Sequence, residues 1–175
     1  MKVLTAIAIG LLLVGCHQRK PPTSKEDAAL ARAKDAETEK IRAGNPGLKE
    51  SCLAKLRANQ LGAFEWIDNP DCFQMLPDQR WSGLWNSGWE WTNFCPDPAK
   101  ECDATADRGD IWLNFAKDAY HGPELPDGVY RIEFIGRRTR VSGHFGHQAQ
   151  YDHLMVADRA ISIQRIPGEK YTKGH

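Results

Sequence analysis

The stretch PDGVYRIEFI, residues 126–135, decides the fold class of this chain. Its opening Pro-Asp-Gly is a turn signal. Apolar and charged residues alternate after the turn. Successive side chains of a strand point to opposite faces, so Arg131 and Glu133 share one face and the apolar residues around them share the other. The stretch predicts a half-buried strand over Val129 to Ile135.

Similar short apolar segments lie on both sides of this strand. The turn at 86–88 joins two of them into a predicted hairpin, and Asp158-Arg159 joins two more into a last hairpin. Six or more short strands at this spacing favour a small antiparallel β-barrel, with a β-sandwich as the competing architecture. The additional strand segments are residues 81–85, 89–91, 111–115, 154–156 and 160–163.

Residues 25–43 are rich in Ala, Glu, Lys and Arg, which are strong helix formers, and Ser24 is a suitable N-cap. Only Leu30 and Ile41 are large and apolar there, so we expect a solvated stalk helix. A coiled-coil partner helix is the alternative, although Leu or Ile is not sustained at heptad positions. A second, short helix follows between residues 48 and 61. The fold class is therefore mainly β with N-terminal helices (α+β).

The first sixteen residues predict a targeting signal rather than a part of the folded domain. Lys2 precedes an apolar run from Val3 to Val14, which is shorter than the roughly 20 residues that span a bilayer. The run ends in Leu13-Val14-Gly15-Cys16, and this segment resembles a bacterial lipoprotein signal with its lipobox. The alternatives are an ordinary signal peptide with an incidental cysteine, or a buried helix.

The resemblance covers only the signal and Cys16, and it implies cleavage before Cys16 and lipid attachment to it. With His17 in the next position, it also implies the outer membrane of a two-membrane cell, facing the periplasm. The expected organisation is a signal peptide (1–15), a tether (16–24), the stalk helix (25–43), a disulfide-stapled β domain with a leading short helix (48–167) and a loose tail (168–175).

Four cysteines remain in an exported chain, which indicates two disulfides with three possible pairings. We expect Cys52–Cys72 and Cys95–Cys102, because each closes a short loop between neighbouring elements. A four-cysteine zinc site is the alternative, but the spacings lack any Cys-x-x-Cys pair.

Charge is unevenly distributed along a chain whose net charge is zero. Residues 17–63 carry +4, residues 64–127 carry −9 and residues 128–175 carry +4. The acidic middle argues against a nucleic-acid surface there. The basic flanks are compatible with lipid headgroups or with an acidic partner.

Six tryptophans fall between residues 66 and 112, and core packing is the first expectation for most of them. If some tryptophans are exposed, we expect them to be Trp89 and Trp91, which could form an aromatic platform for a glycan. Three further arginines form a basic strip with Arg131 that could clamp a carboxylate or phosphate. The alternative is that they pair with the acidic segment 97–110. The three arginines are Arg137, Arg138 and Arg140.

His144, His147 and His153 could bind a transition metal, with Asp152 as the nearest base. Because the first two lie in a glycine-flanked loop, a solvated or turn-capping role is the stronger expectation. No nucleophile elbow, phosphate loop, dinucleotide motif or zinc-protease motif is present, so no catalytic residue and no cofactor is expected.

These patterns predict a lipid-anchored envelope protein whose β domain binds another envelope component, a protein or a glycan. The first alternative is an enzyme acting on glycans or peptidoglycan, or one that depends on a metal, centred on His144, His147 and His153. The second is a structural spacer. The sequence leaves the oligomeric state open.

Overall fold

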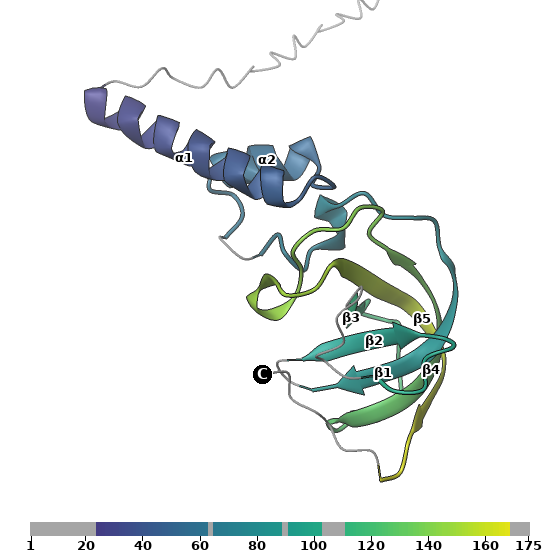
Figure 1. Cartoon of the computed structure of the whole chain (residues 1–175). Helices are drawn as coiled ribbons and strands as arrows, with labels where there is room; N and C mark the ends of the chain where they lie inside the picture. The colour runs from purple at the N-terminus through teal and green to yellow at the C-terminus, as the bar shows by residue number, and fades with distance from the viewer. Residues whose placement is uncertain (1–23, 63–64, 89–90, 103–110, 169–175) are drawn as a thin grey trace, which may run out of the picture.

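Five strands close into a barrel in the computed structural model, which describes residues 24–62, 65–88, 91–102 and 111–168 (Figure 1). The order around the barrel is β1-β2-β3-β5-β4. The mainly β class is confirmed, and the barrel is observed rather than the sandwich. The strands are β1 (Gln79–Ser87), β2 (Thr92–Pro96), β3 (Ile111–Phe115), β4 (Gly128–Arg138) and β5 (His153–Arg165).

Four neighbouring strand pairs are antiparallel, but β3 and β5 run parallel, with Ile111 opposite His153 and Phe115 opposite Ala157. The expectation of a wholly antiparallel barrel is therefore wrong. The long connection after β4 returns the chain so that β5 starts beside the start of β3. Five-stranded Greek-key barrels include the OB folds, which serve many functions, so the architecture alone assigns none.

The predicted last hairpin is also wrong, because β5 is one continuous strand of 13 residues. Asp158 and Ile161 are extra residues at two register shifts against β4. Such bulges bend a strand and increase its twist, which lets a long strand follow a small barrel. Asp158-Arg159 lacks the glycine that a two-residue hairpin turn favours, and the chain bends there instead of reversing.

Aromatic side chains fill the barrel interior. Of the described tryptophans, Trp85 and the partly buried Trp81 belong to this core, and the other three pack in a second core cluster. Trp85 contacts Phe115 and Tyr130, with ring centroids 5.0 and 5.4 Å apart. Phe94 and Phe134 meet edge to face at 5.2 Å. Aliphatic residues complete this barrel core, among them Ile111, Leu113, Ile132 and Met155.

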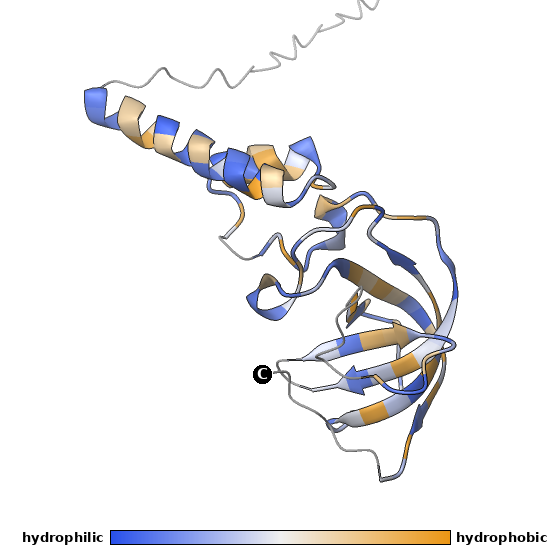
Figure 2. Cartoon of the chain, viewed as in Figure 1, coloured by the Kyte–Doolittle hydropathy of each residue, from blue (hydrophilic) through white to orange (hydrophobic). Residues whose placement is uncertain are grey.

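Two helices precede the barrel, α1 (Lys25–Gly44) and α2 (Glu50–Arg57). The Ser24 side chain accepts a hydrogen bond from the Asp27 backbone N–H, as an N-cap does. The helix expected over 25–43 is confirmed, and it projects away from the barrel (Figure 1). In Figure 2 the ribbon of α1 is a mixture of blue, pale and orange residues, whereas blue, pale and orange residues alternate along the barrel strands.

The C-terminal half of α1 is not solvated all round, because α2 lies along it. Arg57 of α2 donates to Glu39 of α1 at 2.8 Å, and Arg42 of α1 donates to Glu50 of α2 at 2.5 Å. Within the described residues, no helix has the length and apolarity needed to span a bilayer.

A second core cluster fastens the helices to one end of the barrel. Leu53 of α2 packs there with Phe73, which follows the short helix η1 (Pro70–Cys72). Phe145 and Leu154 join them from the barrel side. This helix–barrel core keeps the connection between β4 and β5 close to α2.

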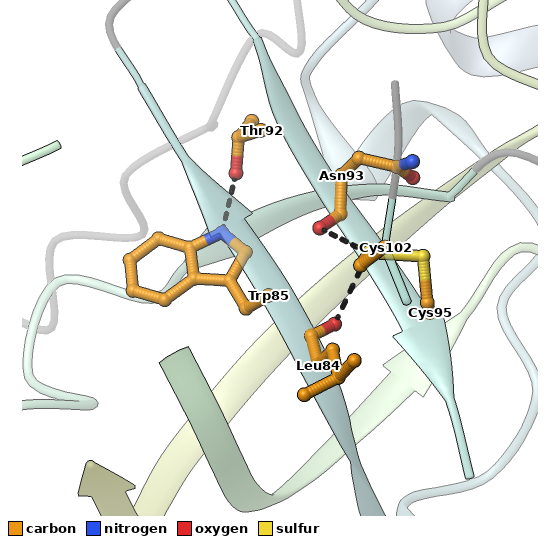
Figure 3. The surroundings of a disulfide bond; sticks show 6 residues. All are labelled: Leu84, Trp85, Thr92, Asn93, Cys95 and Cys102. Carbon is orange, nitrogen blue, oxygen red and sulfur yellow. Dashed lines mark hydrogen bonds between the residues drawn. A yellow bond between two sulfur atoms is a disulfide. The ribbon is translucent and has the colours of Figure 1, made fainter. Parts of the chain in front are cut away.

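Both expected disulfides, Cys52–Cys72 and Cys95–Cys102, are present. The zinc alternative is therefore wrong, since these four sulfurs are consumed in pairs. Figure 3 shows Cys102 against the β1–β2 pair, with its sulfur 3.5 Å from both Leu84 O and Asn93 O.

Candidate binding surface at the 143–152 loop

The connection between β4 and β5 ends in a loop at residues 143–152 that folds back on itself. Phe145 and Tyr151 exchange backbone hydrogen bonds of 2.9 and 3.2 Å. Gly143 N donates to Asp152 O at 2.9 Å. These ladder bonds fix both ends of the loop and leave its tip to project.

Buried aromatic rings anchor this loop to the helix–barrel core. Phe145 meets Phe73 edge to face at 4.8 Å, and Tyr151 meets Trp112 edge to face at 5.0 Å. The loop is thus held by packing as well as by its backbone.

The backbone of the loop tip is strained. Gly146, Gln148 and Ala149 have φ values of +66°, +55° and +57°. Residues other than glycine rarely adopt this left-handed backbone conformation. Each non-glycine residue that does so lowers the stability of the folded state. Glycine is required at 146, because an added Cβ would lie 2.4 Å from the Trp112 ring.

The tip presents polar side chains. Gln150 Nε2 donates to Gln148 Oε1 at 3.0 Å, and Gln148 Nε2 lies 3.2 Å from His147 Nε2. The His147 ring stands edge-on to Trp91 at 5.5 Å. Gln148 and Gln150 are exposed and offer amide donors and acceptors. Sequence reasoning missed both glutamines, and the glycines around them were the only available signal.

The predicted aromatic platform is not found at Trp91, whose side chain is only 7% exposed in the helix–barrel core. Its ring packs in that core and meets the His147 ring of the loop. The expectation of an exposed Trp91 is wrong, and Trp89 lies outside the described residues.

The three histidines make three separate sets of contacts. His144 N donates to Asn45 Oδ1 at 2.9 Å, and its exposed ring lies beside Gly44. His147 contacts Trp91, whereas His153 Nδ1 lies 3.0 Å from Thr139 Oγ1. In the described part of the chain, no group of three or more His, Cys, Asp or Glu side chains could hold a metal ion.

Burial and charge also distinguish His153. Partial burial lowers its pKa, and the Arg138 guanidinium lowers it further. The Asp152 carboxylate and a hydrogen bond that the ring donates to the Thr139 backbone oppose this shift. Its neutral form is therefore favoured in the folded protein.

Two of the four arginines in the basic strip pair with the protein's own carboxylates. Arg131 donates to Asp97 at 2.5 Å, which fits the expected pairing with segment 97–110. Arg137 instead pairs with Asp158 of β5 at 3.3 Å. Arg138 is half-buried near His153, and Arg140 is exposed.

A pocket with a volume of about 360 Å³ lies in the connection between β3 and β4, apart from the 143–152 loop. Phe115, Tyr120 and Leu125 give it an apolar lining, with Lys117 and Glu124 beside them. Its open shape and mixed charge single out no ligand.

The fold and the loop together define a disulfide-bonded, five-stranded barrel domain that carries a strained polar loop. Comparisons with protein-family models, with curated proteins and with solved structures find no match to this chain.

Proposed function

We propose that this protein is a lipid-anchored protein of the cell envelope whose barrel domain binds another envelope component through the 143–152 loop. The lipobox-like Leu13-Val14-Gly15-Cys16 supports the anchor. The two disulfides are typical of a chain that folds in an oxidising compartment. The bound component is a protein or a glycan.

The observation that carries the binding proposal is the strain at Gln148 and Ala149. A non-glycine residue in the left-handed region costs of order 1 kcal/mol, and such strain clusters at sites that bind or switch. Gln148 and Ala149 belong to neither core cluster, so core packing gives no reason to keep their backbone in this geometry. A structural spacer would have no use for such a tip.

An enzyme centred on the histidines has less support. It would need His144, His147 and His153 to converge on one substrate, and each has its own separate contact. The amides at the loop tip are suited to recognition by hydrogen bonding rather than to proton transfer.

The anchor is tested by replacing Cys16 with serine in the full chain. We expect the parent chain in the membrane fraction, with an acylated Cys16 as its first residue by mass spectrometry. The Cys16→Ser chain should leave the membrane fraction. A parent chain that retains Met1 or carries a free Cys16 thiol would contradict the anchor.

The loop is tested with a photo-reactive residue at Gln148 in the full chain, expressed in its native envelope. The matched control carries the same residue at exposed Lys117 of the β3–β4 connection. We expect one discrete adduct from position 148 alone. Loss of the adduct after muramidase digestion indicates a glycan, whereas tryptic peptides of a second protein in it indicate a protein. Identical adducts from both positions would contradict the loop as the binding site.

A further inference from the structure

One face of α1 begins under α2 and continues beyond it. Asp27, Ala31, Lys34, Thr38, Ile41 and Asn45 follow one another in alternating steps of four and three, which places them along one line of a helix. At the C-terminal end of this line Thr38 and Asn45 are buried, and Ile41 packs against the helix–barrel core.

The N-terminal part of this face extends past the end of α2. A helix rises about 1.5 Å per residue, so the 8 residues of α2 cover less than half of the 20 residues of α1. Leu30 lies on this part, and its side chain is 57% exposed.

Leu30 belongs to a groove of about 330 Å³ at the end of α2. Arg57 forms one wall, and its guanidinium is held by Glu39 at 2.8 Å and by Asp35 at 3.6 Å. The wall is thus fixed by contacts between the two helices. The groove is lined by Asp27, Leu30, Ala31, Lys34, Asp35 and Arg57.

We propose that this groove receives α1 of a second copy of the chain, with the two helices antiparallel about a two-fold axis between residues 30 and 31. In that register Leu30 packs on Leu30 of the second copy. Ala31 faces Ala31, and its small size lets the helices approach closely. Asp27 lies opposite Lys34 of the second copy, and the symmetry forms this ion pair twice.

Charge selects this arrangement over the parallel one. Parallel helices in register would place Asp27 against Asp27 and Lys34 against Lys34, and both contacts repel. The antiparallel arrangement also brings the acidic first turn of one α1, with Glu26 and Asp27, towards the basic last turn of the other copy's α2.

The contact covers only two to three turns, which is less than the roughly 800 Å² per partner of a stable dimer in solution. Association therefore depends on local concentration, which anchoring two copies in one membrane raises. The raised local concentration rests on the proposed lipid anchor. The complementarity of the groove to a second copy of α1 does not depend on that anchor.

The first experiment traps the dimer through Ala31→Cys in the full chain, expressed in the bacterial envelope and treated with a mild oxidant. The matched control is Ala29→Cys, which lies on the opposite face of the same helix. We expect a disulfide-linked dimer from position 31 and none from position 29, with the cross-link between the two introduced thiols identified by mass spectrometry of the joined peptides. Equal trapping at both positions, or no trapping at position 31, would overturn the proposal.

The second experiment tests the register by charge exchange in the Ala31→Cys chain. Asp27→Lys alone and Lys34→Asp alone should each lower the trapped fraction by about threefold, because each places like charges in contact twice. The double exchange should restore trapping, which general damage to the helix would not. Failure of this rescue, or adducts formed only with another protein, would overturn the dimer. Membrane fractionation of the same samples tests separately whether the chain is anchored in the membrane.

Discussion

Gly146 is the residue on which the shape of the candidate surface most depends. Its φ of +66° and ψ of −162° lie in a region that only glycine populates. An alanine there would also place its Cβ 2.4 Å from the Trp112 ring. We expect Gly146→Ala to lower the free energy of unfolding by about 3 kcal/mol, measured by urea denaturation.

Gly168→Ala is the control for this prediction. Gly168 also has a positive φ, +83°, but an added Cβ would meet nothing within 4 Å. It should therefore show the backbone cost alone, about 1 kcal/mol. Equal losses in the two variants would mean that the Trp112 contact contributes nothing.

His153 gives the protein a predicted loss of stability in mild acid. Its pKa is lowered in the folded state, so the unfolded chain binds a proton more readily as the pH falls below the ordinary histidine value of 6.5. Binding by the unfolded chain favours unfolding, and stability should decrease from that pH downward. His153→Gln keeps a polar side chain near Thr139 and cannot take up this proton.

The measurement is the free energy of unfolding of both chains between pH 7.5 and about pH 5. The parent chain should lose more stability than His153→Gln over this range. His144→Gln, at an exposed ring, controls for the replacement of a histidine by glutamine. Parallel curves for the parent and His153→Gln would contradict the prediction.

At the scale of elements, the two disulfides close loops of different length. Cys52–Cys72 links α2 to η1 across 20 residues, and Cys95–Cys102 spans 7. The loop-entropy relation gives about 3.3 kcal/mol for the first and about 2.4 kcal/mol for the second. Replacing the cysteines pairwise with alanine should therefore destabilise the protein more at 52 and 72, by roughly 1 kcal/mol in denaturant titrations. The reverse order would contradict the entropic account.

The elements also indicate what the sequence could predict. Strict alternation identified β3 and most of β4, and composition with a serine cap identified α1, because these signals are local. The parallel β3–β5 pair depends on where a long connection returns, which no local pattern encodes. The bulge at Asp158 resembled a turn, since both interrupt an apolar run at a polar residue.

The candidate site was less predictable than the fold, because it depends on side-chain direction. Trp91 has a residue type suited to stacking on a glycan, but its side chain is buried in the helix–barrel core. The histidine spacing suggested convergence, but the three histidines contact Asn45, Trp91 and Thr139 respectively. The exposed glutamines carry no distinctive sequence signal.

At the scale of the whole molecule, β5 couples the two cores. Leu154 and Met155 are neighbours in the chain and both are 0% exposed. Because they point to opposite faces of one strand, Leu154 packs in the helix–barrel core and Met155 in the barrel core. Neither core can lose its β5 contacts without displacing the strand that serves the other.

We therefore expect the described domain to unfold in a single transition. Leu154→Ala and Met155→Ala should each cost about 2–5 kcal/mol and shift the urea midpoints of far-ultraviolet circular dichroism and tryptophan fluorescence together. Ile161→Ala, at a bulge residue that is 40% exposed, should cost less than either. If Leu154→Ala separated the two midpoints, the helices and the barrel would be independent units joined by η1. A coincident shift would mean that the helices and the barrel unfold as one unit, together with the 143–152 loop that packs in the same core as α2.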